Sequence, residues 1–143
     1  MKKIMGLLAG IGLILMTGCV SSLPSVATPK QRTAEAMEAA EFAELMKQDS
    51  LNKDRVVAES LDLLLNDEVS GRRISVMINN HTDCNIIVRF SGDRFYSLPI
   101  AKRSKNFIVI EKGDYVLGAN LCRARYTVSK TFTDSVTMTL SEQ

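Results

Sequence analysis

The densest group of chemically capable side chains lies at residues 79–83, which read Asn-Asn-His-Thr-Asp. An imidazole close to a carboxylate can begin a metal site or a nucleophile–base pair. A metal site needs further ligands, however, and His81 is the only histidine of the chain. A run rich in Asn and Asp is also what a tight turn requires. We therefore predict a turn here, with no bound metal and no cofactor.

Other catalytic arrangements find little support in the sequence. None of the serines lies in a Gly-x-Ser-x-Gly sequence, and nothing places one beside His81. Asp93 and Asp114 each adjoin a glycine, as turn residues commonly do. The chain also has no glycine-rich phosphate loop and no dinucleotide-binding motif. We therefore predict that the protein is not an enzyme.

A basic and aromatic group is the candidate surface for a ligand or a protein partner. Lys102, Arg103 and Lys105 fall in one predicted loop, and Phe95 belongs to the strand before it. The cations could contact phosphates or an acidic partner, and the aromatic ring offers an apolar platform. The alternative is a solvated hairpin loop, because three charges in a loop are usually no more than that.

The N-terminus has the anatomy of an exported protein. Lys2 and Lys3 precede an uncharged apolar run over residues 4–16, and two small residues then lead to Cys19. This run is shorter than the about 20 residues that a membrane-spanning helix needs, and it fits a signal peptide. The stretch Thr17-Gly18-Cys19 resembles a bacterial lipoprotein signal, although Met16 stands where such signals usually carry Leu.

The resemblance implies that residues 1–18 are removed and that Cys19 carries a diacylglycerol and an N-acyl chain such as palmitate. Several acyl chains make a stable membrane anchor, whereas one chain is marginal. Val20 stands where Asp would imply retention in the inner membrane, so the expected location is the outer membrane, facing the periplasm or the exterior. The alternative is an ordinary secretory signal or an anchor helix, with Cys19 incidental.

Lipidation of Cys19 would leave Cys84 and Cys122 as an even pair in an oxidising compartment, where a disulfide is the default expectation. The alternative is a redox or metal-binding pair, but the chain has no Cys-x-x-Cys sequence. Lys2 and Lys3 also leave with the signal, so the mature chain loses the small basic excess of 18 Lys and Arg over 16 Asp and Glu. A nucleic-acid partner is therefore not expected.

The segment after Cys19 predicts a tether and then helix. Residues 19–28 are polar and contain proline, as flexible tethers do. Residues 29–70 form a helical segment that starts with Pro at the first position and is interrupted at Asp49-Ser50, giving one or two helices. Apolar residues fall on one face at Ala39, Phe42, Ala43 and Met46, and later at Val57, Leu61, Leu64 and Leu65. A lid on the following domain is favoured over a partner-binding helix.

Residues 72–143 change to the two-residue period of strands. Seven short strands with turn signals about every ten residues predict an antiparallel β-sandwich, Ig-like or prealbumin-like. Pro99 predicts an edge strand. Cys122 falls out of phase with the apolar set of its strand, so either Gly118 marks a bulge or the disulfide lies outside the core. The bulge is favoured.

Parts of this β segment resemble an uncharacterised family of bacterial lipoprotein domains of unknown function, over about residues 74–140. The shared stretches are NNHTDCNIIVR at 79–89, YSLPI at 96–100, FIV at 107–109, KGDY at 112–115 and NLC at 120–122 before Tyr126. The resemblance implies export, lipidation and a compact β domain, and it brings no catalytic residues. We expect a non-catalytic lipid-anchored envelope protein, with membrane lipid at Cys19 and a protein or envelope component on the β domain. The alternative is a small-ligand or glycan-binding module.

Overall fold

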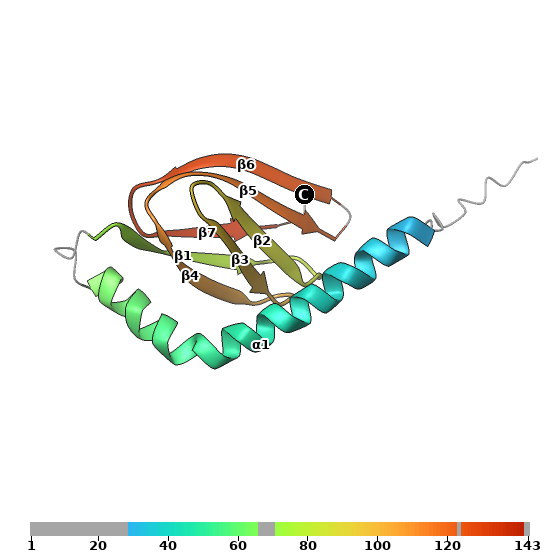
Figure 1. Cartoon of the computed structure of the whole chain (residues 1–143), viewed down its shortest axis with the longest axis horizontal. Coiled ribbons are helices and arrows are strands. Elements are labelled where there is room, and N and C mark those ends of the chain that lie inside the picture. The colour runs from blue at the N-terminus through green and yellow to red at the C-terminus, as the bar shows by residue number, and fades with distance from the viewer. Residues whose placement is uncertain (1–28, 66–70, 123, 142–143) are drawn as a thin grey trace, which may run out of the picture.

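The chain forms one long helix and seven strands over the residues that the computed structural model describes, which are 29–65, 71–122 and 124–141 (Figure 1). The predicted signal, the tether and Cys19 lie outside these residues. The elements are α1 (Pro29–Leu65), β1 (Arg73–Asn80), β2 (Ile86–Ser91), β3 (Phe95–Ile100), β4 (Lys105–Glu111), β5 (Gly113–Leu121), β6 (Ala124–Phe132) and β7 (Val136–Leu140). The seven predicted strands are confirmed, and α1 begins at Pro29 as expected.

The strands form two sheets, which we call sheet A and sheet B. Sheet A has the order β4-β1-β7, and sheet B has the order β3-β2-β5-β6. The wholly antiparallel arrangement that we predicted is wrong at one place, because β1 pairs in parallel with β7 from Val76↔Val136 to Asn80↔Leu140. A parallel pair needs a long crossover. Here the whole of β2 to β6 supplies that crossover, and a strand-by-strand pattern cannot reveal it.

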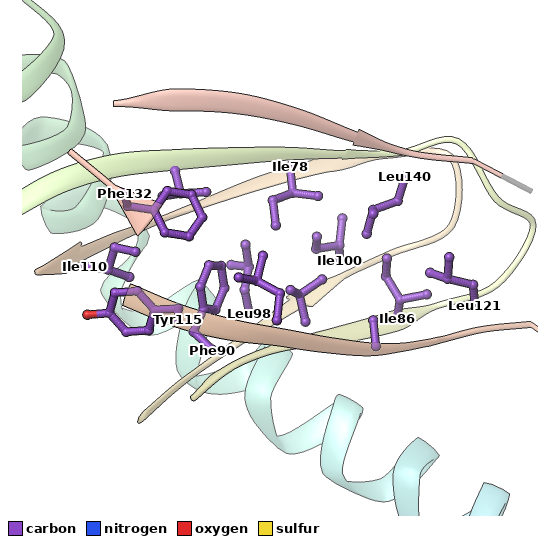
Figure 2. Packing of buried hydrophobic residues seen from close by; sticks show 14 of the residues in the cluster. Ile78, Ile86, Phe90, Leu98, Ile100, Ile110, Tyr115, Leu121, Phe132 and Leu140 are labelled. Atoms are coloured by element: carbon purple, nitrogen blue, oxygen red, sulfur yellow. The ribbon is translucent and has the colours of Figure 1, made fainter. Parts of the chain in front are cut away.

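The hydrophobic core lies between the two sheets (Figure 2). Alternation directs Ile74, Val76 and Ile78 of β1 inward, and each is at most 3% exposed. Three rings form its aromatic end, with Phe90, Tyr115 and Phe132 at centroid separations of 6.0 to 6.3 Å. The other core members, all buried, are Ile86, Val88, Leu98, Ile100, Ile110, Leu117, Ala119, Leu121 and Leu140.

The helix α1 is continuous through Asp49 and Ser50, so the predicted interruption is a bend and not a break. Figure 1 shows the change of direction near the middle of α1. There Ser50 Oγ donates to the Lys47 carbonyl at 2.7 Å, and Asn52 Nδ2 donates to the Gln48 carbonyl at 2.9 Å. Side chains that bond to the helix backbone in this way favour bending without ending the helix.

The bend lets α1 wrap around one edge of the two sheets. Its first half is joined to sheet B, where Glu41 contacts Arg89 of β2. At the bend, Asn106 Nδ2 at the start of β4 donates to Asp49 Oδ2 at 3.1 Å. Its second half then packs near β1 and β4 of sheet A. Because β3 and β4 are edge strands of their sheets, the helix covers edges that could otherwise pair with another chain.

The apolar faces predicted for α1 are only partly correct. Phe42, Met46 and Val57 are partly buried, whereas Ala39 and Ala43 are exposed. Leu61 and Leu65 also lie outward, at 51% and 77% exposure. The prediction fails because the bend rotates the buried stripe, and a straight-helix period does not follow that rotation.

Strand β5 has no bulge at Gly118, which corrects our preferred interpretation. Its ladder with β6 runs unbroken from Gly113↔Phe132 to Leu121↔Ala124. Cys122 instead follows the strand in a turn, with φ of 48°, and its side chain is exposed. The alternative interpretation, a disulfide outside the core, is therefore confirmed. Pro99 lies in edge strand β3, as predicted.

Candidate functional site

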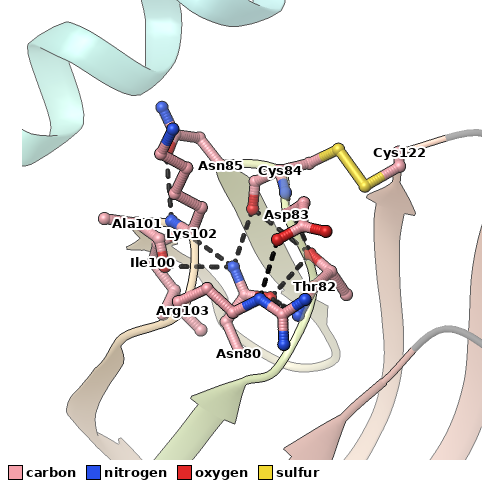
Figure 3. Close-up of a disulfide and its surroundings, with 10 residues drawn as sticks. All are labelled: Asn80, Thr82, Asp83, Cys84, Asn85, Ile100, Ala101, Lys102, Arg103 and Cys122. Atoms are coloured by element: carbon pink, nitrogen blue, oxygen red, sulfur yellow. Dashed lines mark hydrogen bonds and ion pairs between the residues drawn. A yellow bond between two sulfur atoms is a disulfide. The ribbon is translucent and has the colours of Figure 1, made fainter.

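The Asn-rich stretch after β1 is built as a turn, centred on the buried side chain of Asn80 (Figure 3). Asn80 Nδ2 donates to the carbonyls of Cys84 at 2.8 Å and Ala101 at 3.0 Å. Asn80 Oδ1 accepts from the amide of Thr82 at 2.9 Å and from its hydroxyl at 2.7 Å. One side chain thus satisfies several buried backbone groups, which explains the residue types of this stretch structurally.

His81 contributes its backbone to the turn. It is exposed, and its amide donates to the Leu140 carbonyl at 2.8 Å. Residues 29–65, 71–122 and 124–141 hold no group of three His, Cys, Asp or Glu side chains placed for a metal. Asp83 instead accepts from Arg103 Nε at 2.7 Å. That hydrogen bond, and then the guanidinium charge, lower the pKa of the Asp83 carboxyl below its ordinary value of 3.8.

The four residues predicted as a ligand surface do not form one surface. Phe95 begins β3 and is 80% exposed, while Lys102 and Arg103 lie in the turn beyond the other end of that strand. A six-residue strand spans about 20 Å, so the aromatic ring and the cations lie at opposite ends of the domain. Arg103 is engaged with Asp83. Lys105, at the start of β4, lies on a different feature, described below.

The disulfide joins Cys84 to Cys122 as predicted, with the Cα atoms 5.4 Å apart. It links the turn that precedes β2 to the turn that follows β5. Cys84 is half-buried and Cys122 is exposed. The bond therefore ties two turns together at one end of the domain and leaves the core between the sheets to side-chain packing alone.

A large hollow separates the first half of α1 from the outer face of sheet B. It measures about 590 Å³ and is lined by Met37, Gly118, Arg125 and their neighbours. Its strongest polar groups already bind one another. Arg89 contacts Glu38 at 3.6 Å and Glu41 at 2.6 Å, and Asn120 donates to Glu38 at 2.7 Å. These contacts dock the helix on sheet B through Glu38 and Glu41.

The candidate functional site is a second hollow, between the second half of α1 and the outer face of sheet A. We call it the α1 groove. It measures about 310 Å³, within the range of small-ligand sites. Apolar side chains form most of its surface, and the full lining is Val57, Ser60, Leu61, Ser75, Met77, Lys105, Phe107, Ser135, Val136 and Thr137.

Two features distinguish the α1 groove from a packing gap. Ser60 is 5% exposed, and its Oγ has no hydrogen-bond partner. Lys105 lies on the lining with no ion pair to a carboxylate among the described residues. The sequence carries one signal for this site. Met77 and Phe107 are apolar residues on the outward-facing positions of their strands, where a solvated sheet would carry polar ones.

None of the helices in the described part of the chain is long and apolar enough to cross a bilayer. Neither the curated proteins nor the solved structures include a match to this sequence. The family described as domain of unknown function (DUF6759) matches residues 45–143, which is well over half of the chain. The match includes the half of α1 that forms the groove. The chain therefore belongs to this family of uncharacterised domains.

Proposed function

We propose that the protein is a non-catalytic lipoprotein of the bacterial envelope, anchored by acyl chains at Cys19, and that its disulfide-stapled β domain binds a protein or another envelope component. The observation that carries the proposal is the α1 groove, on whose lining Leu61 is half exposed. Leu65, at the end of the same helix, is also exposed. Apolar surface that a folded domain leaves open is characteristic of a binding site. The signal-like stretch that ends at Cys19 supports the anchor.

We further propose that the two sheets form a β-sandwich with the prealbumin-like strand arrangement. In an Ig-like constant domain the first strand would pair with the second, in a sheet that also holds strands four and five. Here β1 pairs with β4 and β7, and β2 lies in the other sheet. Of the two layouts that the sequence left open, the strand order therefore supports the prealbumin-like one.

The anchor is tested by metabolic labelling with palmitate. We expect the wild-type protein to incorporate label and to sediment with outer-membrane vesicles, because a triacylated cysteine is a stable anchor. The Cys19→Ala variant should incorporate none. Label that persists in that variant would place the acyl chain elsewhere and refute the anchor.

The binding role is tested by placing a photocrosslinking amino acid at Leu61, beside the α1 groove, in the membrane-anchored protein. We expect a discrete crosslinked product with an envelope component at this position. The matched control is Phe95, which is also exposed but lies at the first residue of β3. Equal crosslinking at both positions, or none at Leu61, would contradict a binding site at the groove.

The second candidate function is binding of a small ligand or glycan. The volume and apolar lining of the α1 groove favour an apolar ligand over a sugar. Thermal unfolding in the presence of candidate compounds separates these classes, because a ligand that binds only the folded state raises the melting temperature. A shift with apolar compounds and none with envelope sugars is the expected result.

A further inference from the structure

Ser60 is the part of the α1 groove that the fold does not explain. Its side chain is 5% exposed, and its Oγ lacks a hydrogen-bond partner. A buried hydroxyl without a partner destabilises the folded state, and serines inside helices commonly avoid this by bonding to a carbonyl of the preceding turn. Ser60 lines the α1 groove, so its unsatisfied hydroxyl belongs to the wall that an entering molecule would meet.

The second polar group, Lys105, lies at the other end of the groove. Ser75 of β1 pairs with Val109 of β4, and Val109 is four residues from Lys105. The Ser75 end and the Lys105 end of the groove are therefore about 13 Å apart along β4. Over this face the second half of α1 runs in the same direction as β4 and antiparallel to β1. Asp49 lies beside Asn106 next to Lys105, whereas Glu59 next to Ser60 forms an ion pair with Arg73 at the far end of β1.

The surface between these two polar ends is mainly apolar, although Thr137, which pairs with Met77, also lines it. Met77 and Phe107 are directly paired on the outer face of sheet A, and Val57 and Leu61 face the same hollow from α1. An occupant must therefore carry an apolar body of about the length of four strand residues. At one end it meets an ammonium group, and at the other it meets a buried hydroxyl.

We propose that the α1 groove binds an amphiphile with a medium-length apolar chain, a carboxylate at the Lys105 end and a hydroxyl or carbonyl oxygen at the Ser60 end. The apolar chain gains binding free energy by leaving water. The charge of Lys105 selects the anionic group, and Ser60 Oγ donates to the second oxygen. This inference rests on the proposed binding role of the β domain and names the chemical class of the envelope component.

The probes are 10-hydroxydecanoate, decanoate and 1,10-decanediol, titrated calorimetrically below their micellar concentrations. The protein is the mature chain from residue 19 with Cys19→Ser, which keeps every described residue and carries no acyl chain. We expect 10-hydroxydecanoate to bind with one-to-one stoichiometry. Decanoate should bind about fivefold more weakly because it lacks one hydrogen bond. The diol should bind about threefold more weakly because it lacks the charge.

Two variants assign each discrimination to its residue. Ser60→Ala should remove the preference for 10-hydroxydecanoate over decanoate, and Lys105→Met should remove the preference for 10-hydroxydecanoate over the diol. The matched controls are Ser50→Ala, an exposed serine on the same helix, and Lys102→Met, an exposed lysine outside the groove. Both controls should keep the wild-type preferences.

Ser60→Ala carries a second signature that a merely structural role would not produce. Without ligand it should raise the melting temperature more than Ser50→Ala does, because it removes an unpaired buried hydroxyl. With 10-hydroxydecanoate it should lose affinity. A variant that becomes more stable and binds less tightly separates loss of the ligand contact from damage to the fold.

The bound position is checked by NMR of ¹³C-labelled methionine methyl groups. The Met77 signal should shift on addition of 10-hydroxydecanoate, whereas the signal of Met37, on the first half of α1, should stay in place. The inference is overturned by absence of binding, by preferences that survive in Ser60→Ala and Lys105→Met, or by a shift at Met37 without one at Met77. Because the assay contains no membrane, failure of lipidation at Cys19 leaves its outcome unchanged.

Discussion

Gly92 is the residue at which the fold leaves least room. A Cβ added there would lie 2.5 Å from the carbonyl oxygen of Asp114 and 2.8 Å from Cδ1 of Tyr115. One of these groups would have to move, so Gly92→Ala should lower the free energy of unfolding by about 1 to 3 kcal/mol. Urea denaturation followed by circular dichroism measures this loss.

Gly118 provides the matched control, because a Cβ there would meet no atom within 4 Å. Gly118→Ala should leave the stability unchanged or raise it by about 0.4 to 1 kcal/mol, since alanine restricts the unfolded chain. A loss of stability at Gly118 as large as that at Gly92 would contradict the geometry of both positions. A glycine within a strand therefore need not mark a bulge, which is why the bulge predicted at Gly118 is wrong.

Tyr115 makes stability depend on alkaline pH. Burial, and then the nearby Tyr96, raise the pKa of the Tyr115 hydroxyl above its ordinary value of 10.0. A raised pKa in the folded state means that this contribution to stability is complete below pH 10 and is lost as the pH rises through the folded pKa. The free energy of unfolding should therefore fall more steeply above pH 10 in the wild type than in Tyr115→Phe.

The measurement is urea denaturation at pH 8 and pH 11, with Tyr126→Phe in β6 as the control. At pH 8 the Tyr115→Phe variant should lose about 1 kcal/mol, because the hydroxyl donates to the Glu111 carbonyl at 3.0 Å. Identical pH profiles for the wild type and Tyr115→Phe would show that this tyrosine does not cause the alkaline loss.

At the scale of elements, α1 is held to the β domain by a small number of polar contacts on its first half. Arg89 of β2 contacts both Glu38 and Glu41. These side chains are partly exposed, and each such pair is worth only about 0.2 to 1 kcal/mol. Arg89→Gln should thus speed hydrogen exchange of the amides in the first half of α1 and leave the core strands protected.

The control for this variant is Arg125→Gln, which removes a cation from the same hollow without breaking an ion pair to a carboxylate of the described residues. Exchange in α1 should match the wild type in that variant. Equal acceleration by both substitutions would mean that the net charge of the hollow, and not the contacts of Arg89, holds the helix.

The sequence predicted the strands better than the helix, for a physical reason. Inward residues such as Ile74 and Val76 alternate with outward ones because the core fixes the face of each strand. The helix is held at a bend by Asp49 and Asn106, which are 57 positions apart. The spacing of apolar residues along a helix carries no information about such a long-range contact, and so it wrongly predicts that Leu61 is buried.

At the scale of the molecule, the candidate site was harder to predict than the fold. The residues that we expected to act together, Phe95 and Lys102, are close in the sequence, but Phe95 begins β3 and Lys102 lies beyond its other end. The α1 groove instead combines α1, β1, β4 and the segment around β7, which are far apart in the chain. Ser60 gave no signal, because a serine in a helical segment is ordinary until its burial is known.

The disulfide constrains a long segment of the β domain, so its removal should change the stability of the whole molecule. Cys84 and Cys122 join two turns outside the core, so Cys84→Ala combined with Cys122→Ala should leave the folded sheets intact. The bond closes a loop with a sequence separation of 38, and its loss should destabilise the protein by up to about 4 kcal/mol, mainly by expanding the unfolded ensemble.

Guanidinium denaturation should show a lower midpoint and a steeper dependence on denaturant, because the freed chain exposes more surface. Wild-type protein treated with reductant should coincide with the double variant, whereas a folded-state spectrum that changes in both would show that the bond shapes the sheets themselves.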